Sequence, residues 1–323
     1  MRRMNRPDLP VFRRVLVLHP GALGDILLSI PACRDLKKIT KGPLTLAGKI
    51  PVLDMLADAG EIDEAFSFDA AWLAELFGPG DELSSDAGER LLRHDLVVSW
   101  IGDAGGALSR HIASYPGIRS VIGRPVRSDS IDAPRWTVYR RSLEGIMAHG
   151  DPNLSPIKPG PKAVALGVER FRREGLDLSQ RLVALHPGAG REAKRWPLEA
   201  FASIGRTALD DRMAIVILEG PAEPGLGAAL RDRIGGRTCV IAPVNAMELA
   251  GILSACSVYI GNDAGPGHLA AALGLKTVIV YTSTDPRVWS PWGPHVVPVS
   301  ATDDPAAVIR RVMPAIRRRE KAI

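Results

Sequence analysis

The segment at 258–274 carries the residues best suited to chemistry. It reads VYIGNDAGPGHLAAALG, in which an apolar run ends at a glycine-rich turn and an alanine-rich helical stretch follows. Free N–H groups and the positive dipole end make a helix N-terminus an anion site. Gly265 and Gly267 would let a phosphate approach the backbone, and Asp263 and His268 stand beside them. The alternatives are a helix N-cap for Asp263 and an ordinary hydrogen-bonded helix residue for His268.

A second glycine loop begins at His186 and reads HPGAGREAKRWP. Gly188 and Gly190 follow an apolar run, and Lys194 and Arg195 come just before a predicted helix. We expect the lysine to reach a diphosphate over the loop, whereas Arg195 fits a solvated surface better. The spacing excludes a Walker A loop, and the lack of GxGxxG disfavours a dinucleotide-binding dehydrogenase.

The third group is Gly24-Asp25, again after an apolar run. Asp25 lies where a helix should begin, and Pro31 predicts a break or kink after about two turns. Two roles are open for Asp25. It could be a helix cap, or it could be a general base.

The chain repeats one phrase, VLVLHPGALG at 15–24 and LVALHPGAG at 182–190. Each copy predicts a buried parallel strand that leaves its sheet at Pro-Gly before a helix. Strands are predicted at 15–19, 44–47, 96–100, 120–122, 182–186, 214–218, 238–241, 258–260 and 277–281. Helices are predicted at 50–59, 70–77, 107–115, 164–174, 197–209, 225–234, 246–255, 265–273 and 305–319.

This alternation of strands and helices predicts an α/β protein with parallel sheets. We expect two α/β domains, at 1–160 and 161–323, that face each other across a cleft. The segment at 151–162, DPNLSPIKPGPK, is the best linker candidate. The last predicted helix could pack back on the first domain.

Composition narrows the class of protein. The chain has 323 residues, of which 46% are hydrophobic and 24% charged, as in soluble globular proteins. No run approaches the about 18 apolar residues of a membrane span, and no export signal is recognised, so we expect a cytoplasmic protein. The three cysteines have neither disulfide-framework nor zinc-ligand spacing.

The net charge of +5 is unevenly distributed. One arginine-rich segment contains Arg110, Arg119, Arg124, Arg127, Arg135, Arg140 and Arg141, and a second basic cluster lies at 310–321. Both suit an anionic partner such as a phosphorylated lipid, a nucleotide or a membrane surface, although the tail is equally consistent with a solvated surface. Nucleic acid is disfavoured because aromatic residues are only 5% of the chain.

Three blocks resemble glycosyltransferase family 9, the ADP-heptose:lipopolysaccharide heptosyltransferases. They read GALGDILLSIPACRDLKK, HPGAGREAKRWPLEAF and GNDAGPGHLAAALGLKTVIVYTSTDPRVW. The blocks DLVVSW and GGALSRHIASY agree more weakly, so the resemblance extends over nearly the whole chain. It implies the GT-B fold of two Rossmann-like domains, with the acceptor on the N-terminal domain and the nucleotide-sugar donor on the C-terminal domain.

The resemblance also implies residue roles. Asp25 matches the catalytic base, and Lys194 matches the lysine that contacts the donor diphosphate. The donor-binding residues would be Gly188, Gly190, Lys194, Glu223 near the ribose, Asp263, Gly265, Gly267 and His268. The acceptor side would include Gly24, Arg110, Arg119 and Arg124. The chain departs from the family at Ala264, where many members have Thr, and in its hydroxyl-free loop at 188–190.

These features together predict a metal-independent, inverting glycosyltransferase that needs no cofactor. It would transfer a heptose-like sugar from a nucleotide diphosphate, with ADP-heptose expected, to a lipopolysaccharide core or another anionic lipid-linked saccharide. Peripheral contact with the inner membrane would suit such an acceptor. The alternatives are a nucleotide-sugar epimerase on the same fold and a non-catalytic nucleotide-binding protein.

Overall fold

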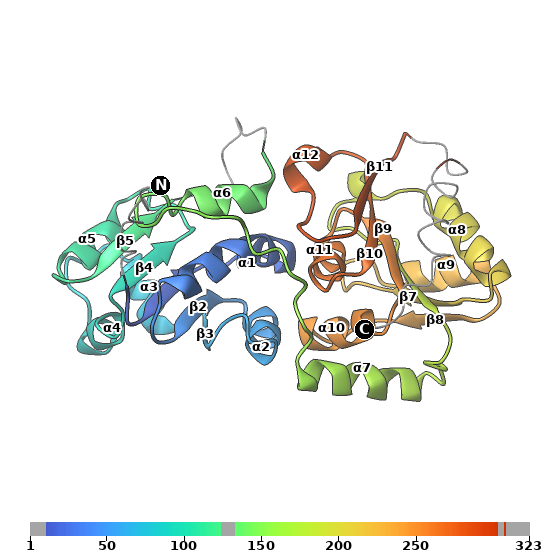
Figure 1. The fold of residues 1–323 in the computed structure, drawn as a ribbon, viewed down its shortest axis with the longest axis horizontal. Coiled ribbons are helices and arrows are strands. Elements are labelled where there is room, and N and C mark those ends of the chain that lie inside the picture. Colours follow the sequence, from blue (N-terminus) through green and yellow to red (C-terminus); the bar gives the residue numbers. More distant parts are fainter. Residues whose placement is uncertain (1–10, 124–132, 303–306, 308–323) are drawn as a thin grey trace, which may run out of the picture. The chain divides into compact units, whose positions relative to one another are not determined.

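The computed structural model describes residues 11–123, 133–302 and 307 (Figure 1). The chain divides into two compact units. The first contains the residues up to Gly21 together with Ser29–Asn153, and the second contains Ala22–Leu28 and the residues from Leu154 onward. The arginine at 124 and, apart from residue 307, the predicted helix at 305–319 lie outside the described residues.

The first unit is built on a parallel sheet with the strand order β3-β2-β1-β4-β5. Its strands are β1 (Val15–Leu18), β2 (Leu44–Gly48), β3 (Glu64–Ser67), β4 (Leu96–Ser99) and β5 (Arg119–Ile122). Its helices are α2 (Ile50–Asp58), α3 (Ala71–Leu76), α4 (Ser85–Leu91), α5 (Ala107–Ala113) and α6 (Arg135–Arg141). Helix α1 (Leu23–Lys38) begins among residues of the second unit and continues in the first.

The second unit has a parallel sheet with the order β11-β10-β9-β6-β7-β8. Its strands are β6 (Leu182–His186), β7 (Ala214–Leu218), β8 (Thr238–Ile241), β9 (Val258–Asn262), β10 (Lys276–Tyr281) and β11 (Val296–Ser300). The helical elements are α7 (Pro161–Arg173), the 3-10 turn η1 (Glu192–Lys194), α8 (Leu198–Asp210), α9 (Leu226–Ile234), α10 (Ala246–Ser254), α11 (Gly265–Ala272) and α12 (Pro286–Trp289).

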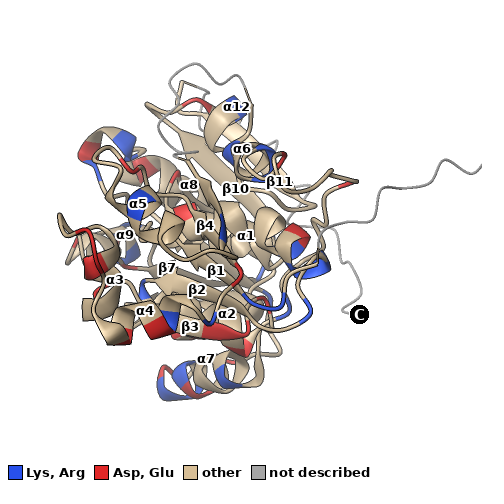
Figure 2. Cartoon of the chain, turned by 90° about the vertical axis from the view of Figure 1, so that its left-hand side faces the viewer, with Lys and Arg blue, Asp and Glu red and all other residues tan. Residues whose placement is uncertain are grey.

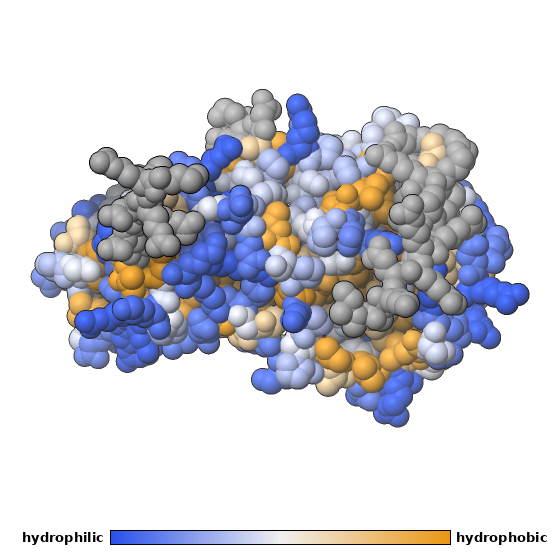
Figure 3. All heavy atoms as spheres, viewed as in Figure 1, coloured by the Kyte–Doolittle hydropathy of each residue, from blue (hydrophilic) through white to orange (hydrophobic). Residues whose placement is uncertain are grey.

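Apolar strands form the core of the second unit. β6, β7 and β9 are buried along their whole length, and Phe201 of α8 packs in the same cluster. Burial of each such side chain contributes about 1.5–3 kcal/mol. α7 lies against α10 (Figure 1), and a Cβ on Gly167 would collide with the Gly251 backbone, so both positions need glycine. The outer side of α7 exposes Val164 and Val168, and Figure 3 shows apolar residues gathered over this helix.

The predicted α/β class with parallel sheets is confirmed, and all nine predicted strands are present. The sequence analysis missed β3 and β11, which both lie at sheet edges. β3 reads EAFS and is only partly buried, so it lacks the continuous apolar run of a central strand. β11 contains Pro298, which cannot donate a ladder hydrogen bond and is therefore tolerated mainly at an edge.

Of the break or kink predicted at Pro31, the break is wrong, because α1 runs without interruption from Leu23 to Lys38, and the kink stays a prediction. Proline has no N–H, so it leaves the carbonyl four residues earlier, that of Leu27, without its helical partner. The indole Nε1 of Trp292 donates to this carbonyl at 2.7 Å. A side chain from the far end of the sequence thus satisfies the carbonyl that Pro31 would otherwise leave unpaired.

We predict that Trp292→Phe lowers the free energy of unfolding by about 1–3 kcal/mol, since a buried acceptor loses its donor. In a Pro31→Ala background, the new backbone N–H at position 31 can bond to the Leu27 carbonyl, so the same change should cost clearly less. Urea unfolding of the four proteins of this double-mutant cycle measures the coupling. An equal cost in both backgrounds would show that the indole bond does not compensate for the proline.

Candidate functional site

Three neighbouring strands of the second unit end at one edge of the sheet and carry the candidate residues. The strand order reverses between β6 and β9, and in open α/β sheets ligands bind at such a switch point. The glycine loop at 187–190 follows β6, Asp263 follows β9, and the segment at 282–284 follows β10. The fold therefore brings together two motifs that are far apart in the sequence, as the Lys194–Asp263 contact at a separation of 69 residues shows.

Asn262, the last residue of β9, fastens the glycine loop to the strand. Its side chain is fully buried. Its Oδ1 accepts from the Trp196 N–H at 3.0 Å, and its Nδ2 donates to the Pro187 carbonyl at 2.8 Å. Both ends of the segment that carries Lys194 are thereby tied to the same amide group.

Asp263 is the electrostatic centre of the site and is 6% exposed. Its Oδ2 accepts from Lys194 Nζ at 2.8 Å and from Thr284 Oγ1 at 2.7 Å, and its Oδ1 lies 3.7 Å from His268 Nε2. Burial opposes ionisation of this carboxyl, but the nearby His268 and the hydrogen bonds from Lys194 and Thr284 outweigh it and lower the pKa to about 2. The site therefore holds a buried carboxylate, and Lys194 is fixed beside it.

Glu223 organises the glycine loop itself. Its Oε1 accepts from the Ala189 N–H at 2.9 Å and lies 3.4 Å from Arg195 Nη2. A Cβ on Gly188 would lie 2.8 Å from Glu223 Oε2, so a larger residue would push the carboxylate away. At Gly190, by contrast, a Cβ would meet nothing within 4 Å. One amide of the loop is thus already engaged, and the open face of the loop is at Gly190.

The start of α11 has no side-chain cap. Ala264, rather than Asp263, occupies the N-cap position, so the alternative of Asp263 as a helix cap is not what the structure shows. Gly267 packs against the sheet, and a Cβ at this position would collide with Ile279 Cδ1. A Cβ on Gly265 would lie 3.3 Å from Leu23. Both glycines therefore allow close packing of the helix start, independently of any ligand.

The first turn of α1 groups with the second unit and places Asp25 near this helix start. A Cβ on Gly24 would lie 3.2 Å from Cδ2 of His268, so the two turns are in contact. Asp25 Oδ2 accepts from the Ala22 N–H at 3.3 Å, which is a capping interaction at the start of α1. Asp25 thus caps its helix, and the turn that carries it lies beside the start of α11.

Several side chains of the arginine-rich segment are already engaged in contacts within the protein. Arg140 is buried and pairs with Asp35 at 2.6 Å. Arg110 is exposed and donates to the Gly105 carbonyl at 3.0 Å, and Arg119 is exposed, with its guanidinium carbon 5.9 Å from the centre of the Phe12 ring. Figure 2 shows basic residues on α5 and α6. The arginine at 124 lies outside the described residues.

The sequence analysis did not single out Asn262 or Thr284. Asn262 reads as the polar end of an apolar strand, and its role depends on a loop that is 75 residues away. Thr284 belongs to the TST run directly after β10, and a cluster of hydroxyl residues at the exit of a strand next to β9 is the signal that could have identified it.

The described residues contain neither a membrane-spanning helix nor a cluster of metal ligands. No helix within 11–123 and 133–302 is both long and apolar enough to cross a membrane. Within the same ranges, no three or more His, Cys, Asp or Glu side chains are grouped in a way that could hold a metal ion.

Comparison with known proteins connects the second unit to a family. Residues 158–314 match the model of glycosyltransferase family 9 (heptosyltransferase). Lipopolysaccharide heptosyltransferase 3 of Escherichia coli K12 is 25% identical over 138 residues, which are 40% of this chain and 39% of the relative. The chain thus matches about two fifths of the length of the first curated relatives. Lipopolysaccharide heptosyltransferase 2 of Salmonella typhimurium is 23% identical over 86% of this chain and 85% of its own length.

A solved structure shows the same fold over almost the whole chain. The E. coli ADP-heptose lipopolysaccharide heptosyltransferase II aligns with a TM-score of 0.73 and 17% identity, covering 94% of this chain and 98% of that one. The resemblance to glycosyltransferase family 9 is confirmed, and so is the GT-B class with two Rossmann-like sheets.

We predict a pH-dependent loss of stability from His186, because burial lowers the pKa of this imidazole from 6.5 to about 4. Between pH 6.5 and about pH 4, His186 is protonated in the unfolded chain and neutral in the folded chain. Stability should therefore fall as the pH decreases through this window, by up to about 3 kcal/mol. Denaturation of His186→Gln at several pH values should show a weaker slope, whereas His295→Gln, which changes a histidine that is not fully buried, should keep the wild-type slope. Identical slopes in all three proteins would contradict the assignment.

Proposed function

We propose that this protein is an inverting glycosyltransferase of the heptosyltransferase type. Its donor would be ADP-heptose, and its acceptor a lipopolysaccharide core or another lipid-linked saccharide. The observation that carries the proposal is the cluster of Lys194, Asp263, His268 and Thr284 at the strand switch point, within the part of the chain that matches the family. The names of the similar proteins support this donor and acceptor class.

Lys194 and the start of α11 would bind the donor diphosphate. An ammonium has three N–H donors, so the bond from Lys194 to Asp263 leaves capacity for a phosphate oxygen. Pro266 has no N–H and the Gly267 N–H donates to the Ala264 carbonyl, so the start of α11 would add the Gly265 N–H and the positive end of the helix dipole. The open face at Gly190 leaves room for the donor over the loop, and Glu223 would hold that loop in shape near the ribose.

The proposed reaction is a single displacement. Asp25 would take the proton from an acceptor hydroxyl as its oxygen attacks the anomeric carbon, while the bond from that carbon to the diphosphate oxygen breaks. Negative charge then develops on the leaving diphosphate, next to Lys194 and the helix amides. Preorganised donors of this kind commonly contribute about 3–4 kcal/mol each to the transition state. Attack from the opposite face inverts the configuration of the sugar.

The first unit would bind the acceptor, in keeping with the proposed domain roles of 1–160 and 161–323. The proposed acceptor contacts are the arginines at 110, 119 and 124, together with Gly24, which lies at the start of α1 among the residues that group with the second unit. The exposure of Arg110 and Arg119 supports a role in binding an anionic saccharide, with peripheral contact at the inner membrane. Arg140 is buried in its pair with Asp35 and is not a proposed acceptor contact.

We predict that Asp25→Asn lowers the rate of sugar transfer by about 10²–10⁴-fold, the usual contribution of a general base. The amide oxygen can still accept from the Ala22 N–H, so the helix start should be retained. Transfer from ADP-heptose to a purified core saccharide is measured by mass spectrometry, and ADP affinity by calorimetry. Asp54→Asn, a change to an exposed aspartate of α2, is the matched control and should leave both unchanged.

Near-normal transfer by the folded Asp25→Asn protein would limit Asp25 to its capping role. Conversion of the nucleotide sugar without any acceptor would favour the epimerase alternative. Binding of ADP without either reaction would favour a non-catalytic nucleotide-binding protein.

A further inference from the structure

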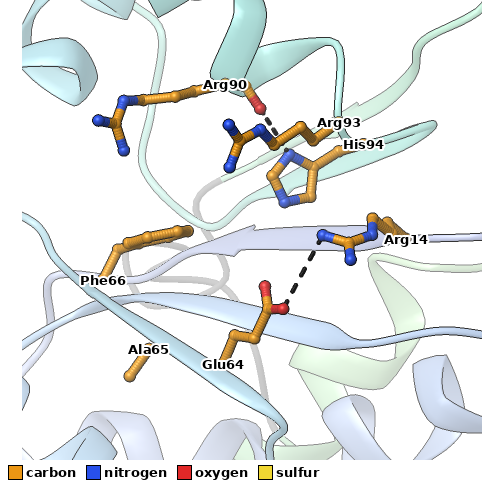
Figure 4. Close-up of a pocket in the computed structure, with 7 residues that line it drawn as sticks. All are labelled: Arg14, Glu64, Ala65, Phe66, Arg90, Arg93 and His94. Carbon is orange, nitrogen blue, oxygen red and sulfur yellow. Dashed lines mark hydrogen bonds and ion pairs between the residues drawn. The ribbon is translucent and has the colours of Figure 1, made fainter.

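A second concave site lies in the first unit, at the edge of its sheet that the proposed function does not use. It is a cavity of about 350 Å³, lined by Arg14, Glu64, Ala65, Phe66, Arg90, Arg93 and His94 (Figure 4). Arg14 directly precedes β1, Glu64 opens β3, and His94 stands two residues before β4. The amino ends of parallel strands share one edge, so this cavity is at the edge opposite the glycine turn after β1.

The cavity carries more positive than negative charge. Three arginines line it and only one carboxylate, Glu64, faces them, with Arg14 Nη1 3.8 Å from Glu64 Oε1. Arg90 pairs through Nε with Asp86 at 2.9 Å, which leaves its terminal nitrogens for other partners. Within the described ranges 11–123 and 133–302, the Arg93 guanidinium forms no ion pair. In Figure 4 the guanidinium group of Arg14 points toward Glu64, and that of Arg93 lies on the other side of the His94 ring.

A neighbouring carboxylate does not cancel this charge by contact. Both oxygens of Asp95 accept backbone N–H groups, from Arg13 at 2.8 Å and from Arg14 at 2.9 Å. Asp95 therefore fixes the chain at Arg14 and does not pair with its side chain. An anion in the cavity would meet guanidinium groups that can form charge-assisted hydrogen bonds.

His94 supplies an acceptor that has no partner among the described residues. The ring is 4% exposed, and its Nδ1 lies 3.1 Å from the Arg90 carbonyl oxygen. A carbonyl can only accept, so Nδ1 carries the proton and Nε2 bears a lone pair in the neutral ring. Burial lowers the pKa of His94, which keeps the ring neutral. Nε2 is buried without a hydrogen-bond partner in that part of the chain, and in Figure 4 it points into the cavity.

The remaining wall is aromatic. Phe66 presents a ring that is held edge-to-face by Trp72, with 5.7 Å between ring centres and 86° between planes. Glu64 lies across from it and also accepts from Thr45 Oγ1 at 3.0 Å. An apolar ring face, two hydrogen-bond acceptors and a cationic side suit a ligand that has C–H groups, hydroxyls and an anionic group together.

We propose that this cavity binds a phosphorylated sugar. The phosphate would lie between Arg14 and Arg93, a hydroxyl would donate to His94 Nε2, and the sugar ring would rest on Phe66. A cavity of about 350 Å³ falls within the range of small-molecule sites, roughly 300–1,000 Å³. The same chemistry is found in a soluble sugar phosphate and in the inositol phosphate headgroup of a lipid.

Calorimetric titration of the full chain with glucose 1-phosphate, inorganic phosphate and glucose tests the proposal. Glucose 1-phosphate should bind more tightly than either fragment. Arg93→Gln should weaken it by about ten-fold or more, since a charge-assisted hydrogen bond is lost. His94→Asn keeps a donor for the Arg90 carbonyl but removes Nε2, so it should weaken glucose 1-phosphate and leave inorganic phosphate unchanged. The exposed Arg172→Gln is the control and should bind as the wild type does.

Two further arms identify the source and the location of the ligand. Flotation with phosphatidylcholine vesicles, with and without phosphatidylinositol, reports a headgroup if binding requires phosphatidylinositol and Arg93. Saturation with ADP should not compete with glucose 1-phosphate, which separates this cavity from the proposed donor site. The proposal is overturned if neither the sugar phosphate nor the phosphatidylinositol vesicles bind, if ADP competes, or if Arg93→Gln binds like the wild type. Equal affinity for inorganic phosphate would reduce the cavity to a simple anion site and overturn its assignment to a sugar.

Discussion

The second unit depends on one buried negative charge. Asp263 has little contact with water, and a carboxylate in such a place is stable only when its oxygens are satisfied. Its partners come from three separate elements, Lys194 from η1, His268 from α11 and Thr284 from the segment after β10. Lys194 compensates the charge and Thr284 satisfies the same oxygen with a hydrogen bond, so the loops at these strand ends are held together before any ligand arrives. This preorganisation places a fixed cation next to an uncapped helix start.

The repeated His-Pro-Gly motif marks the same strand–loop–helix unit in both halves of the chain, but its two histidines have different surroundings. In the first unit His19 packs against the rings of Trp100, at 5.6 Å, and Tyr139, at 5.4 Å. In the second unit the equivalent His186 faces Gly188 and Glu223 at the polar loop. His19 directly follows β1 and His186 is the last residue of β6, and each of these buried central strands lies beside a switch point. The glycine loop of the second copy leads directly to Lys194, which bonds to the buried Asp263, so the candidate anion site lies in the second unit.

The sequence predicted what depends on local pattern. Continuous apolar runs located the central strands, and glycines at their exits located the loops of the candidate site. It could not predict the contacts that close between distant segments, such as the Asn262 amide that ties down the glycine loop or the Thr284 hydroxyl on Asp263. Pro31 failed as a helix breaker for the same reason, because its compensating donor, Trp292, is 265 residues from Leu27.

The crystal structure of the complex with ADP tests the central claim most directly, namely that the switch point of the second unit binds the donor. The account predicts the diphosphate within hydrogen-bond distance of Lys194 and of the amides at the start of α11, with Asp263 still bonded to Thr284. A diphosphate bound on the turns after β1 and β4 of the first unit would contradict it. So would a complex in which Lys194 remains on Asp263 alone and makes no contact with the nucleotide.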